Sequence, residues 1–267
     1  MKFGSIGLVL SFVPIVAACD TSAEMESSLR AGGFALVVER WPPSGGTLNT
    51  ASLGDGPLMR LLPPSYPGGL ARVDDVVVHD VELVPAPIGL DASLWVSAPQ
   101  GELVVATGDG VHKGEALVGS KWWLDSFHTH YLTVTEHAFA GHHGYQFEER
   151  WIDEENQSTP ICEADDQGER WAYVVSDVLV TADARIEPDP GALLIACASG
   201  ALGKAITWGF SPWHGTHADP LRFYQTGVRT VRADYCGDGV SWTEDGTWIQ
   251  VSSTSAGLVF WHPKMKT

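Results

Sequence analysis

Tyr131-Leu132-Thr133-Val134-Thr135, in the middle of the segment His130–Glu136, alternates strictly between apolar and polar positions after its first residue. Successive side chains of an extended strand point to opposite faces, so Leu132 and Val134 share one face and the two threonines share the other. This pattern is typical of a strand that packs one face on a core. The segment therefore predicts antiparallel β-structure in the middle of the chain.

Similar short runs rich in β-branched and aromatic residues lie on both sides of this segment, separated by Gly, Pro and Asp turns. Regularly spaced short strands predict antiparallel sheets in a sandwich or a barrel. No strand–helix alternation of about 30 residues is present, which disfavours a parallel α/β sheet. The further candidate strands are Phe34–Trp41, Val76–Val84, Leu94–Val96, Glu102–Ala106, Tyr145–Trp151 and Trp171–Val180.

The character of the sequence changes after Glu187-Pro188-Asp189-Pro190-Gly191, which predicts a break in regular structure. Leu193–Cys197 is a candidate buried strand, and the Ala/Gly-rich segment Ala198–Ala205 predicts the start of a short helix. We therefore expect a β-rich region over residues 34–186 and a C-terminal region over residues 187–267, packed on the same body.

A helix is predicted from Asp219, because apolar residues follow it at helical spacing. Asp219 is a suitable N-cap, Pro220 suits the first turn, and Gly237 suits the end of the helix. A final hairpin is expected, with strands Ser241–Thr243 and Thr247–Val251. The expected fold is mainly β, with a C-terminal α+β unit of one or two helices and a hairpin. The apolar helix positions are Leu221, Tyr224, Val228, Val231 and Tyr235.

The first residues predict a bacterial lipoprotein signal over residues 1–18. Met1-Lys2 precedes the apolar run Phe3–Ala18, which is shorter than the roughly 20 residues that span a bilayer. The run ends in Val16-Ala17-Ala18-Cys19, where small residues precede a cysteine that would receive the lipid. Residues 19–33 are polar and small, as expected of a lipidated tether.

This signal predicts an exported protein that is held on a membrane by its N-terminal lipid and faces the periplasm or the cell surface. The formal net charge of −17 makes nucleic acid an unsuitable partner, because phosphate backbones are repelled. An envelope glycan or an envelope protein remains as the possible further partner.

Three cysteines, Cys162, Cys197 and Cys236, remain after the lipidated one. An exported compartment is oxidising, so we expect at least one disulfide. One thiol is then left over, either as an inert buried group or as a nucleophile.

Several segments resemble the ADYC domain family, which is named for the tetrapeptide found here as Ala233-Asp234-Tyr235-Cys236. The resemblance implies an exported bacterial protein of unknown function, and it transfers no catalytic residue. The matching segments are Pro160–Cys162, Cys197–Lys204, Trp208–Trp213, Val228–Gly239 and Thr243–Thr247.

Two cysteines of the family pattern are replaced here by Ala205 and Gly227. The joint loss implies that a disulfide between these places has been lost, so the two backbones should lie within disulfide reach. The resemblance then favours a second bridge between Cys197 and Cys236. The competing pair is Cys162–Cys197.

A structural role is sufficient to explain the motif Ala233–Gly239. Small Ala233 permits close packing, Gly237 suits a left-handed cap, and Asp234 and Asp238 can accept bonds from backbone N–H groups. Gly239 completes the motif. A calcium loop made by Asp234, Asp238 and Asp245 is the alternative, but these residues lack the regular spacing of an EF-hand loop.

Histidines are concentrated between residues 128 and 143. His128 and His130 would share one face of a strand, a geometry that zinc sites use. We nevertheless expect no metal and no other cofactor, because no carboxylate lies at the spacing of a zinc protease motif. The candidates for weak metal binding are His128, His130, His142 and His143.

Tryptophan is abundant, with 11 residues. Trp122, Trp123 and Trp213 lie near predicted turns, where exposed rings would stack on sugars, whereas Trp151 is expected in the core. His214-Gly215-Thr216 and Gly227-Val228-Arg229 faintly resemble L,D-transpeptidases, but Gly227 stands at the place of the nucleophile.

We therefore expect no catalytic residue and a non-enzymatic binding or structural module of the cell envelope. The alternatives are a glycan- or peptidoglycan-binding module and a cysteine- or zinc-dependent envelope enzyme.

Overall fold

A computed structural model of the chain describes most of the region between residues 53 and 261. Residues 1–52, which contain the expected signal, Cys19, the tether and the strand Phe34–Trp41, lie outside the described residues. The described residues are 53, 59–68, 75–83, 94–152, 157–165, 168–181, 184–213, 218–234 and 237, with the backbone of 250–253 and 258–261.

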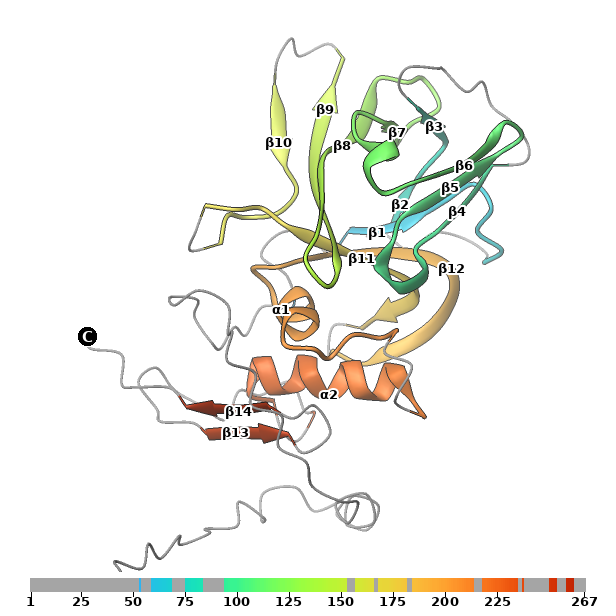
Figure 1. Cartoon of the computed structure of the whole chain (residues 1–267). Helices are drawn as coiled ribbons and strands as arrows, with labels where there is room; N and C mark the ends of the chain where they lie inside the picture. The colour runs from blue at the N-terminus through green and yellow to red at the C-terminus, as the bar shows by residue number, and fades with distance from the viewer. Residues whose placement is uncertain are drawn as a thin grey trace, which may run out of the picture.

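Nine strands form one large sheet, which confirms the expected mainly β fold (Figure 1). Its strand order is β2-β1-β12-β11-β9-β8-β7-β3, with β10 paired to β9. Neighbouring strands are antiparallel except for the parallel pair β1 and β2. The bounds are β1 Met59–Leu62, β2 Asp75–Val77, β3 Asp80–Glu82, β7 Lys121–Trp123, β8 His130–Phe139, β9 His143–Trp151, β10 Ser158–Pro160, β11 Ala172–Val180 and β12 Ile186–Cys197.

The two ends of this sheet are joined by one continuous segment, because β2 and β3 are separated only by Val78 and His79. The Val78 N–H donates to the carbonyl of Leu62 beside β2, and the His79 N–H donates to the carbonyl of Trp123 beside β3. The sheet therefore curls on itself in a barrel-like form. The single strand expected over Val76–Val84 is instead two strands that change partner in the middle.

The inside of the curled sheet holds one apolar core. Leu132 and Val134 both point into it, as their alternation predicts, together with Leu193 and Ile195 of β12. A second, three-stranded sheet packs on this core and contributes Val105. This sheet, called sheet B below, consists of β4 Trp95–Ser97, β5 Val104–Thr107 and β6 Gly110–Lys113, and it is flanked by the 3-10 turns η1 Pro99–Gly101 and η2 Gly114–Leu117.

A cavity of about 10 Å³ remains at the centre of the curled sheet. This volume is close to the minimum for one water molecule, and the lining offers no polar partner, so the space suits neither water nor a substrate. Its lining comes from the large sheet and from Leu103, which precedes β5. The lining residues are Leu61, Leu103, Trp122, Leu132, Phe147, Val174, Leu193 and Ile195.

Two helices cover the outer face of β11 and β12 (Figure 1). α1 spans Ala201–Thr207 and α2 spans Pro220–Arg232, and the side chains of Leu194 and Ala196 on β12 pack beneath them. Alternate residues of β12 thus serve two different cores. The Tyr224 hydroxyl donates to the Leu202 carbonyl at 3.1 Å and joins the two helices, and burial raises the pKa of this tyrosine. No helix among the described residues is long and apolar enough to cross a membrane.

The start of α2 is confirmed and its end is corrected. The Asp219 carboxylate accepts from the Arg222 N–H at 3.0 Å as the predicted N-cap, and Pro220 occupies the first turn. The helix ends at Arg232 because Ala233 takes the left-handed conformation, with φ 54°. Gly237, the expected end, also has a positive φ of 72°, but it lies in the turn that follows.

The break expected at Glu187–Gly191 is wrong, since β12 runs through it. Among the described residues, Pro188 of β12 pairs only with β11, and β1 joins the other edge of β12 from Leu193 onward. A missing N–H is tolerated at such an edge position. A register shift opposite this segment places Asp177 at φ 63°, and its carboxylate accepts from the Gly191 N–H.

A C-terminal hairpin is present, but it lies later in the chain than expected. β13 spans Gln250–Ser253 and pairs with β14, which spans Leu258–Trp261. The predicted first strand Ser241–Thr243 and its turn lie outside the described residues.

Candidate functional site

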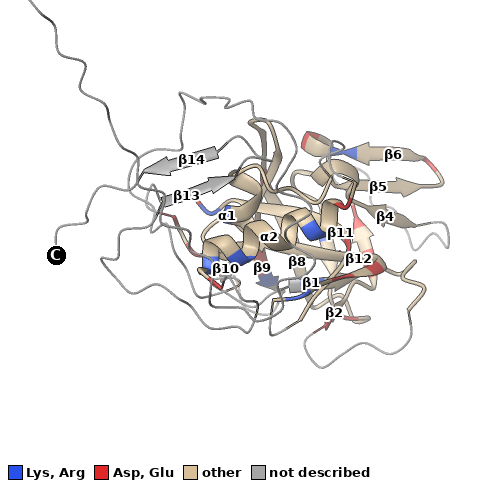
Figure 2. Cartoon of the chain, turned by 90° about the horizontal axis from the view of Figure 1, so that it is seen from below, with Lys and Arg blue, Asp and Glu red and all other residues tan. Residues whose placement is uncertain are grey.

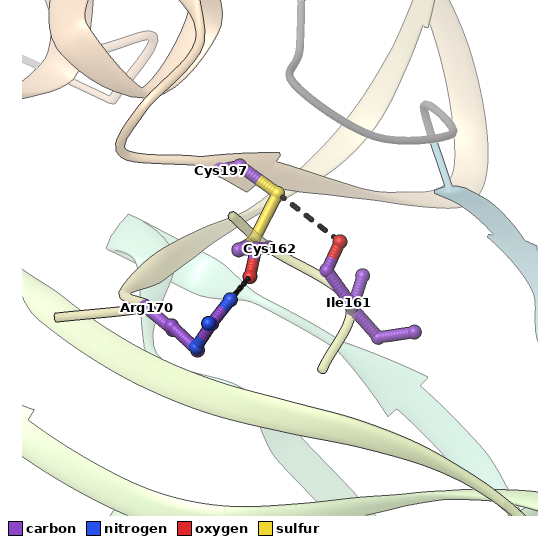
Figure 3. The surroundings of a disulfide bond; sticks show 4 residues. All are labelled: Ile161, Cys162, Arg170 and Cys197. Carbon is purple, nitrogen blue, oxygen red and sulfur yellow. Dashed lines mark hydrogen bonds between the residues drawn. A yellow bond between two sulfur atoms is a disulfide. The ribbon is translucent and has the colours of Figure 1, made fainter. Parts of the chain in front are cut away.

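The disulfide joins Cys162, just after β10, to Cys197 at the end of β12 (Figure 3). The preferred pair Cys197–Cys236 is therefore wrong, and the competing pair is the one formed. β10 lies on β9 while Cys197 faces the inner core, so the two sulfur atoms meet inside the curled sheet. Both cysteines are buried, and neither described cysteine is a thiol. Cys236 lies outside the described residues.

The side chain of Arg170 holds the backbone of Cys162 beside the bridge. Arg170 donates from Nη1 to the carbonyl of Cys162 at 2.9 Å, and the sulfur of Cys197 lies 3.9 Å from the carbonyl oxygen of Ile161 (Figure 3). The second distance is a packing contact, because a disulfide sulfur carries no proton to donate. The position suits a structural bridge with no access to substrate.

Two of the three tryptophans expected to stack on sugars, Trp122 and Trp123, are buried. Trp122 faces the inner core and donates from its ring N–H to the Ser120 hydroxyl at 2.8 Å. Trp123 faces outward, but the rings of His128 and Tyr131 cover it. Neither offers an exposed ring face, and this part of the glycan hypothesis is wrong.

Exposed aromatic and apolar side chains lie instead beside the start of β8 and the end of β9. Phe127 is 86% exposed, Ile152 is 53% exposed and Trp151 is 37% exposed. Trp151, which was expected in the core, stacks on His130 with ring centroids 4.3 Å apart. The oxygens of Asp125 accept from the Phe127 and Thr129 N–H groups and hold the loop. Phe127, Trp151 and Ile152 are called the aromatic patch below.

His128 and His130 do not share a face. His128 precedes β8 with φ 55°, stacks on Trp123 and lies 3.7 Å from an oxygen of Asp80. His130 is the first residue of β8, and its Nε2 lies 2.7 Å from an oxygen of Glu149 on β9. The two imidazoles therefore have separate partners and do not form the zinc geometry that the spacing indicated.

A pair of histidines in mutual contact lies at the other end of this hairpin. Nε2 of His137 on β8 lies 3.1 Å from Nδ1 of His143 on β9. The ring centroids are 5.4 Å apart. This distance exceeds the distance between the two nitrogens by about two ring radii, so the nitrogens face each other along the line between the rings. One of the two facing nitrogens carries the N–H and donates a hydrogen bond to the other. His137 was absent from the predicted site residues, and its place on the alternating strand with His143 was the available signal.

This head-on geometry fits a shared proton better than a shared metal. Two imidazoles that bind one tetrahedral zinc aim their lone pairs at a third point rather than at each other. Nδ1 of His137 lies 3.7 Å from an oxygen of Glu115, on the opposite side of the ring from His143. Within the part of the chain that the structure describes, no group of three or more His, Cys, Asp or Glu is placed to hold a metal.

The third histidine, His142, contacts the opposite layer. Its ring meets Tyr173 on β11 and Trp213, after α1, with centroids 6.2 Å away in both cases. Trp213 is half-buried and lies against η1, where a Cβ on Gly101 would be 3.0 Å from its ring. At the hairpin end, His137 thus lies against η2 beside sheet B, and His142 contacts Tyr173 of β11 and Trp213. His137, His142 and His143 are called the tip histidines below.

The surroundings favour neutral imidazole at this place. Burial lowers the pKa of His143, Glu102 opposes this effect, and His137 and Lys113 lower the pKa further. Tyr145, which packs on His137, is fully buried, and burial raises its pKa to about 12. Its hydroxyl accepts from the Leu103 N–H at 2.8 Å, which fixes the chain just before β5.

Charge is unevenly distributed over the molecule. The two helices carry Lys204, Arg222, Arg229 and Arg232 and no acidic residue, although the chain as a whole has a net charge of −17. Figure 2 shows the resulting blue segments on the helices and red segments among the strands. The helical layer is therefore the more basic side of an acidic protein.

Comparison with known proteins places the chain in a family. The ADYC domain matches residues 114–264, which are more than half of the chain. The chain belongs to the ADYC domain family. No curated protein and no solved structure matches it. The ADYC match includes the tip histidines, the disulfide and both helices, whereas β1 to β6 precede it.

Part of the tetrapeptide that names the ADYC domain lies at the end of α2. Ala233 is buried and forms the left-handed cap, and its own N–H bonds the last turn of the helix. Asp234 is buried, lies 3.7 Å from Arg232, and donates from its N–H to the Arg229 carbonyl. These contacts support the structural interpretation of the motif. Tyr235, Cys236, Asp238, Gly239 and Asp245 lie outside the described residues.

The bridge that the family pattern implies between Ala205 and Gly227 stays a prediction. Both residues are buried, on helices that pack together. A Cβ at Gly227 would overlap the side chain of Phe210, so this phenylalanine occupies the space beside the glycine.

Proposed function

We propose that this ADYC domain protein is an exported lipoprotein of the bacterial cell envelope that acts as a non-enzymatic binding or structural module. The observation that carries the proposal is the buried Cys162–Cys197 disulfide. Stable structural disulfides belong to oxidising compartments outside the cytoplasm. The segment Val16–Cys19 supplies the matching signal and the residue for lipid attachment.

Metabolic labelling with palmitate tests the anchor. The wild-type protein should incorporate label, and globomycin, which blocks the lipoprotein signal peptidase, should leave a longer precursor. The Cys19→Ser variant should incorporate none. Normal processing under globomycin would contradict the lipoprotein proposal.

The side chains and the cavity among the described residues support a binding role rather than catalysis. Both described cysteines are consumed by the disulfide, so a cysteine-dependent enzyme would have to use Cys236. The apolar cavity is too small for a substrate. The aromatic patch, in contrast, presents ring surfaces to solvent, and such surfaces are enriched where proteins bind partners.

Envelope glycan is the second candidate function, supported by the exposed ring of Trp151. Sedimentation with purified sacculi tests it on the mature chain. The double variant Phe127→Ala/Trp151→Ala should lose sedimentation. Trp95→Ala is the matched control, because Trp95 is 51% exposed on sheet B, away from the aromatic patch. Wild-type protein that stays in solution would remove the glycan candidate and leave the lipoprotein proposal intact.

A further inference from the structure

The His137–His143 contact depends on the number of protons that the two rings hold. A neutral imidazole has one N–H and one acceptor nitrogen, so two neutral rings, or one neutral and one charged ring, satisfy the 3.1 Å contact. When both rings are charged, both facing nitrogens carry a proton and repel each other. The contact therefore exists only while the pair holds fewer than its maximum number of protons.

One ring of the pair, that of His137, is also packed against η2, the turn that follows β6 of sheet B. A Cβ on Gly114, at the start of η2, would lie 3.2 Å from Cε1 of His137, so this turn lies close against the ring. The ring of Tyr145 packs on His137 with centroids 5.0 Å apart. The same tyrosine bonds the Leu103 N–H, and Leu103 lines the apolar cavity.

We propose that the His137–His143 pair is an acid-sensitive latch that holds β8 to β9 at the end of the hairpin, where His137 packs on η2 beside sheet B. Protonation of both rings separates β8 from β9 at the hairpin end and disturbs the packing of Tyr145 on His137, and with it the hydrogen bond that holds the Leu103 N–H. The inference is independent of the proposed function, because it rests only on the contacts of the described residues.

The charged groups around the pair set the direction of the effect. Glu115 of η2 faces His137 and is 80% exposed, so it is weakly placed to stabilise a second charge. Glu102, between η1 and β5, and Lys113 of β6 both affect the pKa of His143, and they pair with each other at 3.0 Å. Burial is the largest effect and lowers the pKa of His143, Glu102 favours the charged ring, and His137 and Lys113 oppose it.

The sign of the pH dependence follows from His143. Its pKa is lowered in the folded chain, so the unfolded chain binds more protons once the pH falls below about 6.5, the usual value for histidine. The contribution of His143 to the free energy of unfolding is fully present above that pH, and it decreases as the pH falls toward the lowered pKa. The latch therefore opens on the acid side.

Amide hydrogen exchange of the mature chain, read by NMR between about pH 7.5 and about pH 5, tests the latch. After correction for intrinsic exchange, protection of the Leu103 amide should be lower at about pH 5 than at about pH 7.5. The amide of Leu194, in the β11–β12 ladder, is the internal control and should keep its protection.

The double variant His137→Gln/His143→Asn is the matched control, because the two side-chain amides replace the facing nitrogens and do not titrate in this range. Its Leu103 protection should not change between the two pH values. An equal acid loss in the variant, or no loss in the wild type, would overturn the proposal. If the variant does not fold, the imidazole resonances of the wild type decide, since titration of His137 and His143 independently of each other is incompatible with a shared proton.

Discussion

Arg60 and Asp75 lie directly opposite each other on the parallel strands β1 and β2, and their side chains form a buried ion pair. Asp189 of β12 binds the same guanidinium, accepting from Nε of Arg60 at 3.0 Å. The Tyr66 hydroxyl donates to Asp189 at 2.9 Å and accepts from Nη2 of Arg60 at 3.0 Å. Burial works to lower the pKa of Arg60, but its hydrogen bonds with Asp75 and Asp189 outweigh burial and raise it. One cation thus joins three strands of the large sheet.

Replacement of Arg60 by methionine should strongly destabilise the fold. The change leaves the buried carboxylate of Asp75 without its cation, which typically costs about 3–5 kcal/mol. The free energy of unfolding in urea measures the loss. Lys113→Met is the matched control, because Lys113 pairs with Glu102 on the exposed side of sheet B and should lose less than about 1 kcal/mol. Equal losses would contradict the importance of the buried network.

Removal of the disulfide by Cys162→Ser/Cys197→Ser should lower the free energy of unfolding by about 2–4 kcal/mol, because the bridge closes a loop across a sequence separation of 35 residues. Peptide mapping without reduction should find the Cys162 and Cys197 peptides joined. A joined peptide that contains Cys197 and Cys236 would show that the described pairing is wrong.

Tyr145→Phe should destabilise the chain by about 1–3 kcal/mol, since it leaves the buried Leu103 N–H without its acceptor. Thermal unfolding with calorimetry measures the change. Tyr173→Phe supplies the comparison, because the Tyr173 hydroxyl bonds Thr207 in an exposed position and its loss should cost less than about 1 kcal/mol. The proposed role of Leu103 would be weakened if both variants were equally stable.

Asp219→Ala should cost about 1 kcal/mol, because the N-cap bond to the Arg222 N–H is lost. Asp219→Asn retains an acceptor oxygen at the same place and should restore most of the stability. Urea denaturation of the two variants in parallel checks the difference, and an asparagine variant as unstable as the alanine variant would argue against a capping role.

Local sequence patterns predicted the elements whose structure depends on neighbouring residues. The alternation at Leu132 and Val134 and the cap at Asp219 are set by strand geometry and by the first helical turn. The patterns failed where a distant strand decides the outcome. Pro188 is compatible with β12 because, in the part of the chain that the structure describes, no second strand pairs with that position.

The candidate site was harder to predict, because it depends on which layer covers each side chain. Trp122 and Trp123 face opposite sides of β7, yet both are buried, since the core covers one and the rings of His128 and Tyr131 cover the other. The partnership of His137 and His143 requires the β8–β9 register, in which His143 pairs with Phe139 and His137 pairs with Tyr145. Neither the covering layers nor this register can be obtained from spacing alone.

The pairing of β1 with β12 has a consequence for the order in which the molecule assembles. Met59 lies opposite Ile195, so two neighbours in the finished sheet are separated by about half of the chain. Contacts of such long sequence separation form late, because the loop between them must be closed first. For a chain that crosses a membrane with its N-terminus leading, as we propose here, β1 emerges long before its partner. The barrel then stays open during passage and closes only after β12 has arrived. The topology itself therefore keeps the chain unfolded and competent for translocation until translocation is nearly complete.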